Sequence, residues 1–417
     1  MLVLVAGRVQ AAADRPIRLY NSASFDALAI SKEGKTRMTD PAWPEVYRKL
    51  GVAPLINAQS WVTALGGSIM RPEVLRAMDE AAGAYVDMMQ LNRAAGEVVA
   101  RSCGAEQGLV TAGCSAAQVL MVAACMTGQS ESNVEQLPDT TGMKDEVVLF
   151  KGQRNRYDKA FVTAGSTLVE YGSANSATAE QLDEAINDNT ACVAFVIGPF
   201  IDPGIGLEET VRVAHARGVP VIVDAAAEVP PRANLTKFHK MGADMVAFSG
   251  GKGIGGPQSA GLLAGKADLI EAAVMNSLNM HAPIAGIGRP MKVSKENIVG
   301  LVAAIELFTD SDEGIEWEGW QSKAKYVADR LAGINGVKVA IEDESAERQG
   351  PQPVLRFDDA YEGPPIAEIK ARLENGDPAI FVGGAEARGE ICIVMVNVRD
   401  GEEIIIADRL GEILQSD

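Results

Sequence analysis

Residues 249–257, SGGKGIGGP, surround a single lysine with glycines, and this spacing could serve two kinds of chemistry. Gly251, Gly253 and Gly256 satisfy the dinucleotide pattern G-x-G-x-x-G, which requires a helix directly after the glycines. The chain instead continues through Pro257 into the strand-like QSAGLLAG, and the Walker A pattern is not met either. The remaining interpretation is a lysine whose small neighbours let it reach a cofactor and form a Schiff base.

Pyridoxal phosphate (PLP) attached to a lysine needs an acid beside its pyridine nitrogen and a cradle for its phosphate. Asp224, at the carboxyl end of the apolar run VPVIVD, is the candidate acid, because ligands of open α/β sheets gather at this end of the strands. A role as a cap or turn residue is the alternative. The candidate cradle is TAGCSAA, residues 111–117, a strand-to-helix turn of small residues; the alternative is a tight turn with Ser115 as the helix N-cap. Ser249 can add a hydroxyl group.

Alternating strands and helices must position these residues. Strands are predicted within 105–113 and at 146–150, 166–171, 191–197, 219–223, 243–248 and 259–265, with helices including 178–187 and 208–217. This alternation predicts a mostly parallel sheet with helices on both faces. After a helix near 294–309, an α+β tail is predicted, with helices at 315–333, 364–375 and 402–414 and strands at 336–343, 353–357 and 390–396.

The N-terminal 37 residues have a short apolar opening without the basic flank of a signal peptide. Asp40 and Pro41 are typical of a helix start, so we expect Met38 to be the natural start of the protein. The domain prediction is a loosely ordered extension (1–37), a segment that packs with the small domain (38–80), a large PLP-binding domain (81–300) and a small α+β domain (301–417).

Composition excludes several classes of protein. The 417 residues are 47% hydrophobic and carry a net charge of -18, as in an acidic soluble enzyme, which disfavours electrostatic capture of nucleic acid or an anionic membrane. Five cysteines without a C-x-x-C pair indicate reduced cytoplasmic thiols, with neither a disulfide framework nor a metal site. No apolar run approaches the roughly 18 residues that span a bilayer. We therefore expect a cytoplasmic protein with a small-molecule partner.

Several stretches resemble one known family. GADMVAFSGGKGIGGPQSAGLLAGKADLI is similar to the Schiff-base region of bacterial selenocysteine synthases (L-seryl-tRNA(Sec) selenium transferases), which are fold-type I PLP enzymes. PLINAQSWVTALGGSIMRPEVLRAM, GLVTAGCSAA, LPDTTGMKDEVV and VDAAAEVPP resemble most closely the group that includes D-glucosaminate-6-phosphate ammonia-lyase. The similarity runs from about Met38 to the C-terminus. It implies a three-layer α/β/α large domain, a smaller α+β domain and at least a homodimer.

The resemblance also implies roles for individual residues. Lys252 would be the Schiff-base lysine and Asp224 the partner of the pyridinium. The other residues expected around the cofactor are Ala112, Gly113, Cys114, Ser115 and Ser249. The candidates for binding the substrate are Arg289 and Lys292, with Arg93, Arg154 and His281 as further candidates. For Arg93 and Arg154 a solvated surface role is the alternative.

Two departures from the synthases bear on the substrate. The synthases carry aspartate where this chain has Gly251, and a glycine-serine sequence where it has DAAAE. We therefore predict a PLP-dependent lyase that eliminates water and ammonia from a hydroxylated amino acid, including sugar-derived or phosphorylated ones, to give a 2-keto acid. The alternatives are a racemase, aldolase, aminotransferase or selenocysteine-synthase-like transferase. A non-catalytic module is the last alternative, and the presence of both Lys252 and Asp224 argues against it.

Overall fold

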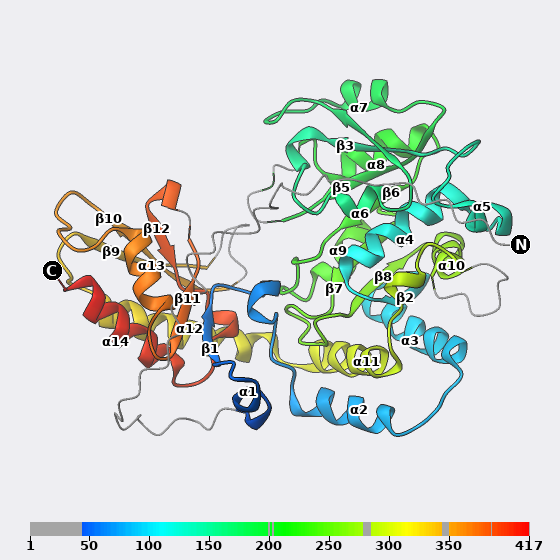
Figure 1. Ribbon diagram of the computed structural model, residues 1–417. Helices are drawn as coiled ribbons and strands as arrows, with labels where there is room; N and C mark the ends of the chain where they lie inside the picture. The colour runs from blue at the N-terminus through cyan, green and yellow to red at the C-terminus, as the bar shows by residue number, and fades with distance from the viewer. Residues whose placement is uncertain are drawn as a thin grey trace, which may run out of the picture. The chain divides into compact units, whose positions relative to one another are not determined.

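The computed structural model describes residues 44–198, 201, 204–277, 285–343, 350–384 and 386–416 (Figure 1). The chain divides into two units, residues 1–54 and residues 55–417. In the first unit, α1 (Glu45–Leu50) ends at Gly51, whose left-handed backbone (φ 71°) closes the helix. The predicted extension over 1–37 and the start at Met38 lie outside the described residues, and the domain boundaries remain predictions.

The second unit contains a seven-stranded sheet with the strand order β2-β8-β7-β6-β5-β3-β4 (Figure 1). Its strands are β2 (Gln107–Thr111), β3 (Glu146–Phe150), β4 (Thr167–Tyr171), β5 (Thr190–Val196), β6 (Val221–Asp224), β7 (Met245–Ser249) and β8 (Gly261–Gly265). Only β8 is antiparallel to its neighbours, β2 and β7, which therefore run in the same direction. The other neighbouring strands are parallel. The predicted, mostly parallel sheet is confirmed.

Helices cover both faces of this sheet because alternate strand residues point into two separate cores. In β6, Val221 and Val223 belong to one core and Ile222 to the other. The first core includes residues of α2 (Pro72–Ala82), α3 (Met88–Cys103), α7 (Ala179–Ala185), α8 (Leu207–Ala216), α9 (Asn234–Lys240) and α11 (Lys295–Asp310). The second includes residues of α4 (Cys114–Thr127), α6 (Lys159–Val162) and α10 (Ala267–Asn276). α5 (Glu131–Gln136) precedes β3. Strands buried on both faces explain the continuous apolar runs, and the α/β/α arrangement is confirmed.

Side-chain caps fix where several helices begin. The carboxylate of Asp87 accepts hydrogen bonds from the backbone N–H groups of Met89 (2.8 Å) and Gln90 (3.0 Å) at the start of α3. The Ser294 side chain likewise caps α11. Each cap satisfies N–H groups that have no partner within the helix, a contribution of roughly 1 kcal/mol.

The C-terminal residues build a third core together with Ile56 and Ala58. The elements around it are α12 (Glu313–Leu331), β9 (Val337–Glu342), β10 (Gln352–Phe357), α13 (Ile366–Glu374), β11 (Ala379–Val382), β12 (Glu390–Cys392) and α14 (Glu402–Leu414). β12, β10 and β9 form an antiparallel sheet, and β1 (Leu55–Ala58) pairs in parallel with β11. None of the described helices is long and apolar enough to cross a membrane.

One strand predicted in the C-terminal part was too long, and one strand pairing was missed. The strand expected over 390–396 ends at Cys392, because Met395–Asn397 forms a 3-10 turn. The pairing of β1 with β11 was not predicted. Each of these strands has four residues, too few to show a periodic pattern, and their partners are far apart in sequence.

Candidate active site

Three strand ends meet around Gly261 in β8. Gly261 pairs with Thr111 of β2 on one side and with Ser249 of β7 on the other. A Cβ atom added to Gly261 would lie 2.5 Å from the backbone carbonyl carbon of Gly113, closer than real contacts allow. The turn after β2 therefore crosses directly over Gly261, and the structure places the predicted cradle beside Ser249.

The cradle is the uncapped start of a helix. α4 begins at Cys114 with Gly113 as its N-cap, and no side chain caps its N–H groups. The alternative that Ser115 is the N-cap is therefore wrong; its side chain is exposed. The hydroxyl of Thr111 donates a hydrogen bond to the Gly113 carbonyl (2.9 Å) and holds the turn. The unpartnered N–H groups and the positive end of the helix dipole suit an anionic phosphate.

Asp224, at the end of β6, is only 6% exposed. Its Oδ1 accepts hydrogen bonds from the Ala226 N–H (3.0 Å) and the Cys114 thiol (3.4 Å), and its Oδ2 accepts one from Nε2 of Gln118 (2.5 Å). Burial raises the pKa of Asp224, and these three donors and the charge of Lys252 oppose that rise. The site thus holds an oriented carboxyl group where a cationic ring nitrogen would be a strong ion-pair partner.

Lys252 lies half-buried in the loop that follows β7. The Gly255 N–H donates to the Lys252 carbonyl (2.9 Å), and the Gly256 N–H donates to the Gly250 carbonyl (2.8 Å), so the loop turns back on itself. The chain then enters β8 rather than a helix, which agrees with the exclusion of a dinucleotide loop. The charge of Lys252 lowers the pKa of Asp224 against the effect of burial, so the two groups interact electrostatically.

The predicted substrate-binding residues differ in how close the structure places them to the cradle. Lys292 is exposed, and it lines a small cavity together with Thr111, at the end of β2. Arg289, in the 3-10 turn Arg289–Met291, is exposed. His281 lies outside the described residues. The structure therefore brings Lys292 to the edge of the sheet that carries the cradle.

The two remaining arginines lie on the surface. Arg93 is an exposed residue of α3 that lines a hollow with Glu97 and Glu271. Arg154 follows β3 and forms ion pairs with Asp158 (2.5 Å) and Glu170. The hydrogen bond to Asp158 raises the pKa of Arg154. Its charge is already paired, which favours the surface role for Arg154.

Two residues at the site were not predicted from the sequence. Gln118, buried in α4, fixes Asp224, and its own Oε1 has no hydrogen-bond partner. A single amide within the apolar run CSAAQVLMVAACM was the signal that could have identified it. Glu228 has a buried Oε1 without a hydrogen-bond partner, in the turn after Asp224.

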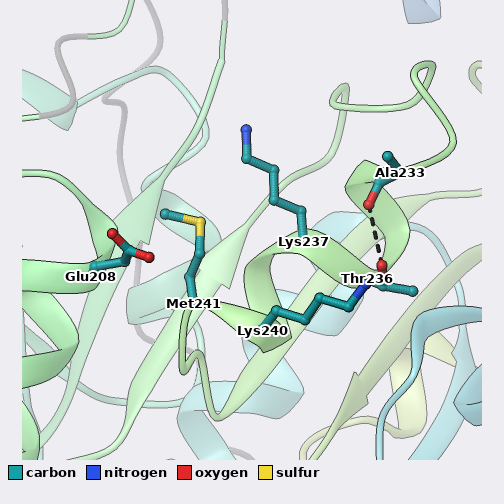
Figure 2. Close-up of a pocket in the computed structure, with 6 residues that line it drawn as sticks. All are labelled: Glu208, Ala233, Thr236, Lys237, Lys240 and Met241. Carbon is teal, nitrogen blue, oxygen red and sulfur yellow. Dashed lines mark hydrogen bonds between the residues drawn. The ribbon is translucent and has the colours of Figure 1, made fainter.

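A separate surface hollow lies between α8 and α9 and is drawn in Figure 2. Its lining residues are Glu208, Ala233, Thr236, Lys237, Lys240 and Met241. The hydroxyl of Thr236 donates a hydrogen bond to the Ala233 carbonyl (3.4 Å) within this wall. None of the predicted site residues lines the hollow, so Glu208 and Lys240 can serve as control positions.

Gly261→Ala tests the position of the cradle. The added methyl group would meet backbone atoms of Gly113 (2.5 Å) and Cys114 (2.8 Å), so the turn must shift. Overpacking of this kind costs about 1–3 kcal/mol, so we expect at least ~5-fold weaker binding of PLP by the apoprotein, measured by absorbance titration. Gly319→Ala in α12, where the methyl group meets nothing within 4 Å, is the control and should bind like the wild type. Unchanged affinity in Gly261→Ala would contradict this position of the cradle.

Comparison with protein families gives one match over most of the chain. The family model described as "SelA: L-seryl-tRNA selenium transferase" matches residues 56–360. Among individual relatives, the chain is 34% identical over 379 residues to the D-glucosaminate-6-phosphate ammonia lyase of Salmonella typhimurium (strain 14028s / SGSC 2262), covering 89% of this chain and 98% of the relative. It is 33% identical over 380 residues to a 5'-C-glycyluridine monooxygenase-decarboxylase of Streptomyces sp, covering 88% and 92%.

Solved structures agree with these sequence matches. A structure of D-glucosaminate-6-phosphate ammonia-lyase superposes with a TM-score of 0.78 at 34% identity, covering 89% of this chain and 98% of that chain. A serine palmitoyltransferase of Sphingomonas wittichii superposes with a TM-score of 0.55 at 14% identity, covering 86% and 87%. The second likeness concerns the fold alone, and together they confirm the predicted fold class.

Proposed function

This chain belongs to the L-seryl-tRNA selenium transferase family, and from that membership we propose that it is a PLP-dependent lyase. The reaction proposed is elimination of water and ammonia from a hydroxylated amino acid, with a 2-keto acid as the product. The observation that carries the cofactor assignment is the convergence of the Lys252 loop, the buried Asp224 and the uncapped start of α4 at one edge of the sheet. The assignment as an ammonia-lyase is supported by the Salmonella relative, which this chain matches over nearly its whole length.

The charges and donor groups of the residues around the site suit PLP. The N–H groups at the start of α4 and the Ser249 hydroxyl would hold the phosphate, and Asp224 would hold the positive charge of the ring nitrogen. Lys252 would bind the aldehyde carbon covalently. When bound, PLP supplies an electron sink for the electron pair left at the substrate Cα.

Lys252 has a second task in this proposal. Its Nζ would also remove the proton from the substrate Cα. Lys292, beside Thr111, and Arg289 would bind the carboxylate or a distal phosphate of the substrate, as ammonium and guanidinium groups suit such anions.

D-Glucosaminate 6-phosphate is the first substrate to test, since the Salmonella relative bears its name. Purified protein with PLP should release ammonia and a 2-keto acid in equal amounts, measured by coupled assays. A panel of hydroxylated amino acids in both configurations should follow. If no compound in the panel yields keto acid, the lyase proposal is wrong.

A second candidate function follows from the Streptomyces relative, which matches almost as well and is named for a different reaction. An oxidative decarboxylation would consume oxygen and release carbon dioxide. The proposed elimination neither consumes oxygen nor releases carbon dioxide. Measuring oxygen uptake and carbon dioxide beside ammonia separates the two. Oxygen consumption in step with substrate loss would replace the lyase proposal by the oxidative one.

We also propose a cytoplasmic protein that forms at least a homodimer and binds no nucleic acid. The net charge of -18 supports the last point. Exposed apolar side chains on and after α2, including Leu75 (49%) and Tyr85 (104%), support an association surface. Light scattering on the purified protein tests the dimer, which a monomeric mass would contradict.

A further inference from the structure

Glu228 lies in the turn that follows Asp224, and its backbone is fixed on both sides. The Glu228 N–H donates a hydrogen bond to the Ala225 carbonyl (3.1 Å), and its carbonyl accepts one from Nδ2 of Asn234 (2.6 Å). The Ala225 N–H in turn donates to the Ala247 carbonyl of β7 (2.9 Å). The turn is therefore tied to the strand that leads to Lys252.

The backbone next to Glu228 also touches the lysine loop directly. A Cβ atom added to Gly253 would lie 2.2 Å from the carbonyl oxygen of Val229 and 2.7 Å from Cδ of Pro230. Gly253 follows Lys252, and Val229 follows Glu228. Glycine at 253 is what allows the two backbones to approach so closely, which brings the Glu228 turn against the lysine loop.

One oxygen of the Glu228 carboxyl group, Oε1, is buried and accepts no hydrogen bond. Burial raises the pKa of Glu228, the charge of Asp224 raises it further, and the charges of Lys252 and Lys237 oppose both. A buried carboxyl oxygen without a hydrogen-bond partner favours the uncharged form of the group, which can donate a proton.

The proposed elimination leaves one requirement that Lys252 alone does not meet. Hydroxide is a poor leaving group, so the β-oxygen needs a proton as its bond to Cβ breaks. We propose that Glu228 is the acid that supplies this proton, a role that rests on the proposed function. The Cβ–O bond breaks with its electron pair on oxygen, the carboxyl proton of Glu228 moves to that oxygen, and water leaves.

Lys252 can supply Glu228 with a proton in place of the one that Glu228 donates. Lys252 Nζ takes the Cα proton, and Glu228 becomes a carboxylate when it donates its own. Transfer of the proton from the Lys252 ammonium to the Glu228 carboxylate restores both groups to their starting protonation states. The close approach of Gly253, next to Lys252, to Val229, next to Glu228, supports this return path.

The acid role is tested by assaying the Glu228→Gln variant on two substrates that differ in their leaving group. With the hydroxylated substrate that the wild type turns over, we expect kcat to fall by at least ~100-fold, the lower range for a general acid. With β-chloroalanine the loss should be at most a few-fold, since chloride leaves without a proton. Glu208→Gln, the same change in the exposed hollow of Figure 2, should leave both rates unchanged. Equal losses on both substrates, or no loss on either, would overturn the acid role.

A second measurement does not depend on turnover. The infrared spectrum of the PLP-loaded enzyme at neutral pH should contain a protonated-carboxyl band that disappears in Glu228→Gln and persists in Glu208→Gln. Absence of any such difference contradicts the acid role. Circular dichroism must show both variants folded. A wild type inactive on every hydroxylated compound and on β-chloroalanine would overturn the proposed function, and the Glu228 role with it. An active wild type with equal losses in Glu228→Gln would overturn the Glu228 role alone.

Discussion

Lys252→Ala is expected to lose at least ~10³-fold in turnover, because the proposed function gives this residue both the covalent attachment of PLP and the removal of the Cα proton. General base catalysis alone contributes roughly 10²–10⁴-fold, and loss of the attachment adds to that. The variant should also lack the yellow absorption band of the wild type. Ammonia release and the visible spectrum are the measurements.

Lys240→Ala is the matched control for this change. Lys240 lines the surface hollow of Figure 2 and has no place in the proposed chemistry. It should retain wild-type turnover and colour. If Lys252→Ala kept turnover within a few-fold of the wild type, another residue would hold the cofactor and the site would be wrongly assigned.

Asp224→Asn is expected to lower kcat by at least ~100-fold, the scale on which removal of one oriented electrostatic group acts in a buried site. The substitution keeps the size of the side chain, removes its charge and replaces one acceptor oxygen by an amide NH2 group, so the ring nitrogen would lose its ion-pair partner. Substrate affinity should change less than kcat, because Asp224 is hydrogen-bonded to Cys114 and Gln118 and does not line the cavity that Lys292 lines. Steady-state kinetics with saturating PLP measure both quantities.

Asp183→Asn provides the comparison for that variant. Asp183 is paired with Arg217 (2.6 Å) and its side chain is 45% exposed, so an effect on kcat is not expected. An Asp224→Asn enzyme with the kcat of the wild type would show that the buried carboxylate does not support the ring nitrogen.

Much of the site could be predicted because it depends on strand ends. An apolar run that ends in aspartate, and a strand that ends before a glycine-lysine loop, place Asp224 and Lys252 at one edge once the sheet is parallel. The register of Gly261 against Thr111 and Ser249 then adds the cradle. The roles of these residues remain predictions.

The remaining features depend on contacts that no local pattern encodes. Gln118 meets Asp224 across the interface of helix and sheet, and the Glu228 turn meets the lysine loop through Val229 and Gly253. Ser115 is of a residue type that favours the N-cap, yet the N-cap is Gly113, two residues earlier. The N-cap preference of serine did not decide the start of α4, where the turn after β2 lies close against Gly261.

Reductive labelling tests the central claim most directly. The purified enzyme, saturated with PLP and treated with borohydride, is digested, and the peptide masses are measured. The account predicts a pyridoxyl group on the peptide that carries Lys252, absent from the Lys252→Ala variant. A protein that takes up no label, or that carries the label on a different lysine such as Lys292, would contradict it.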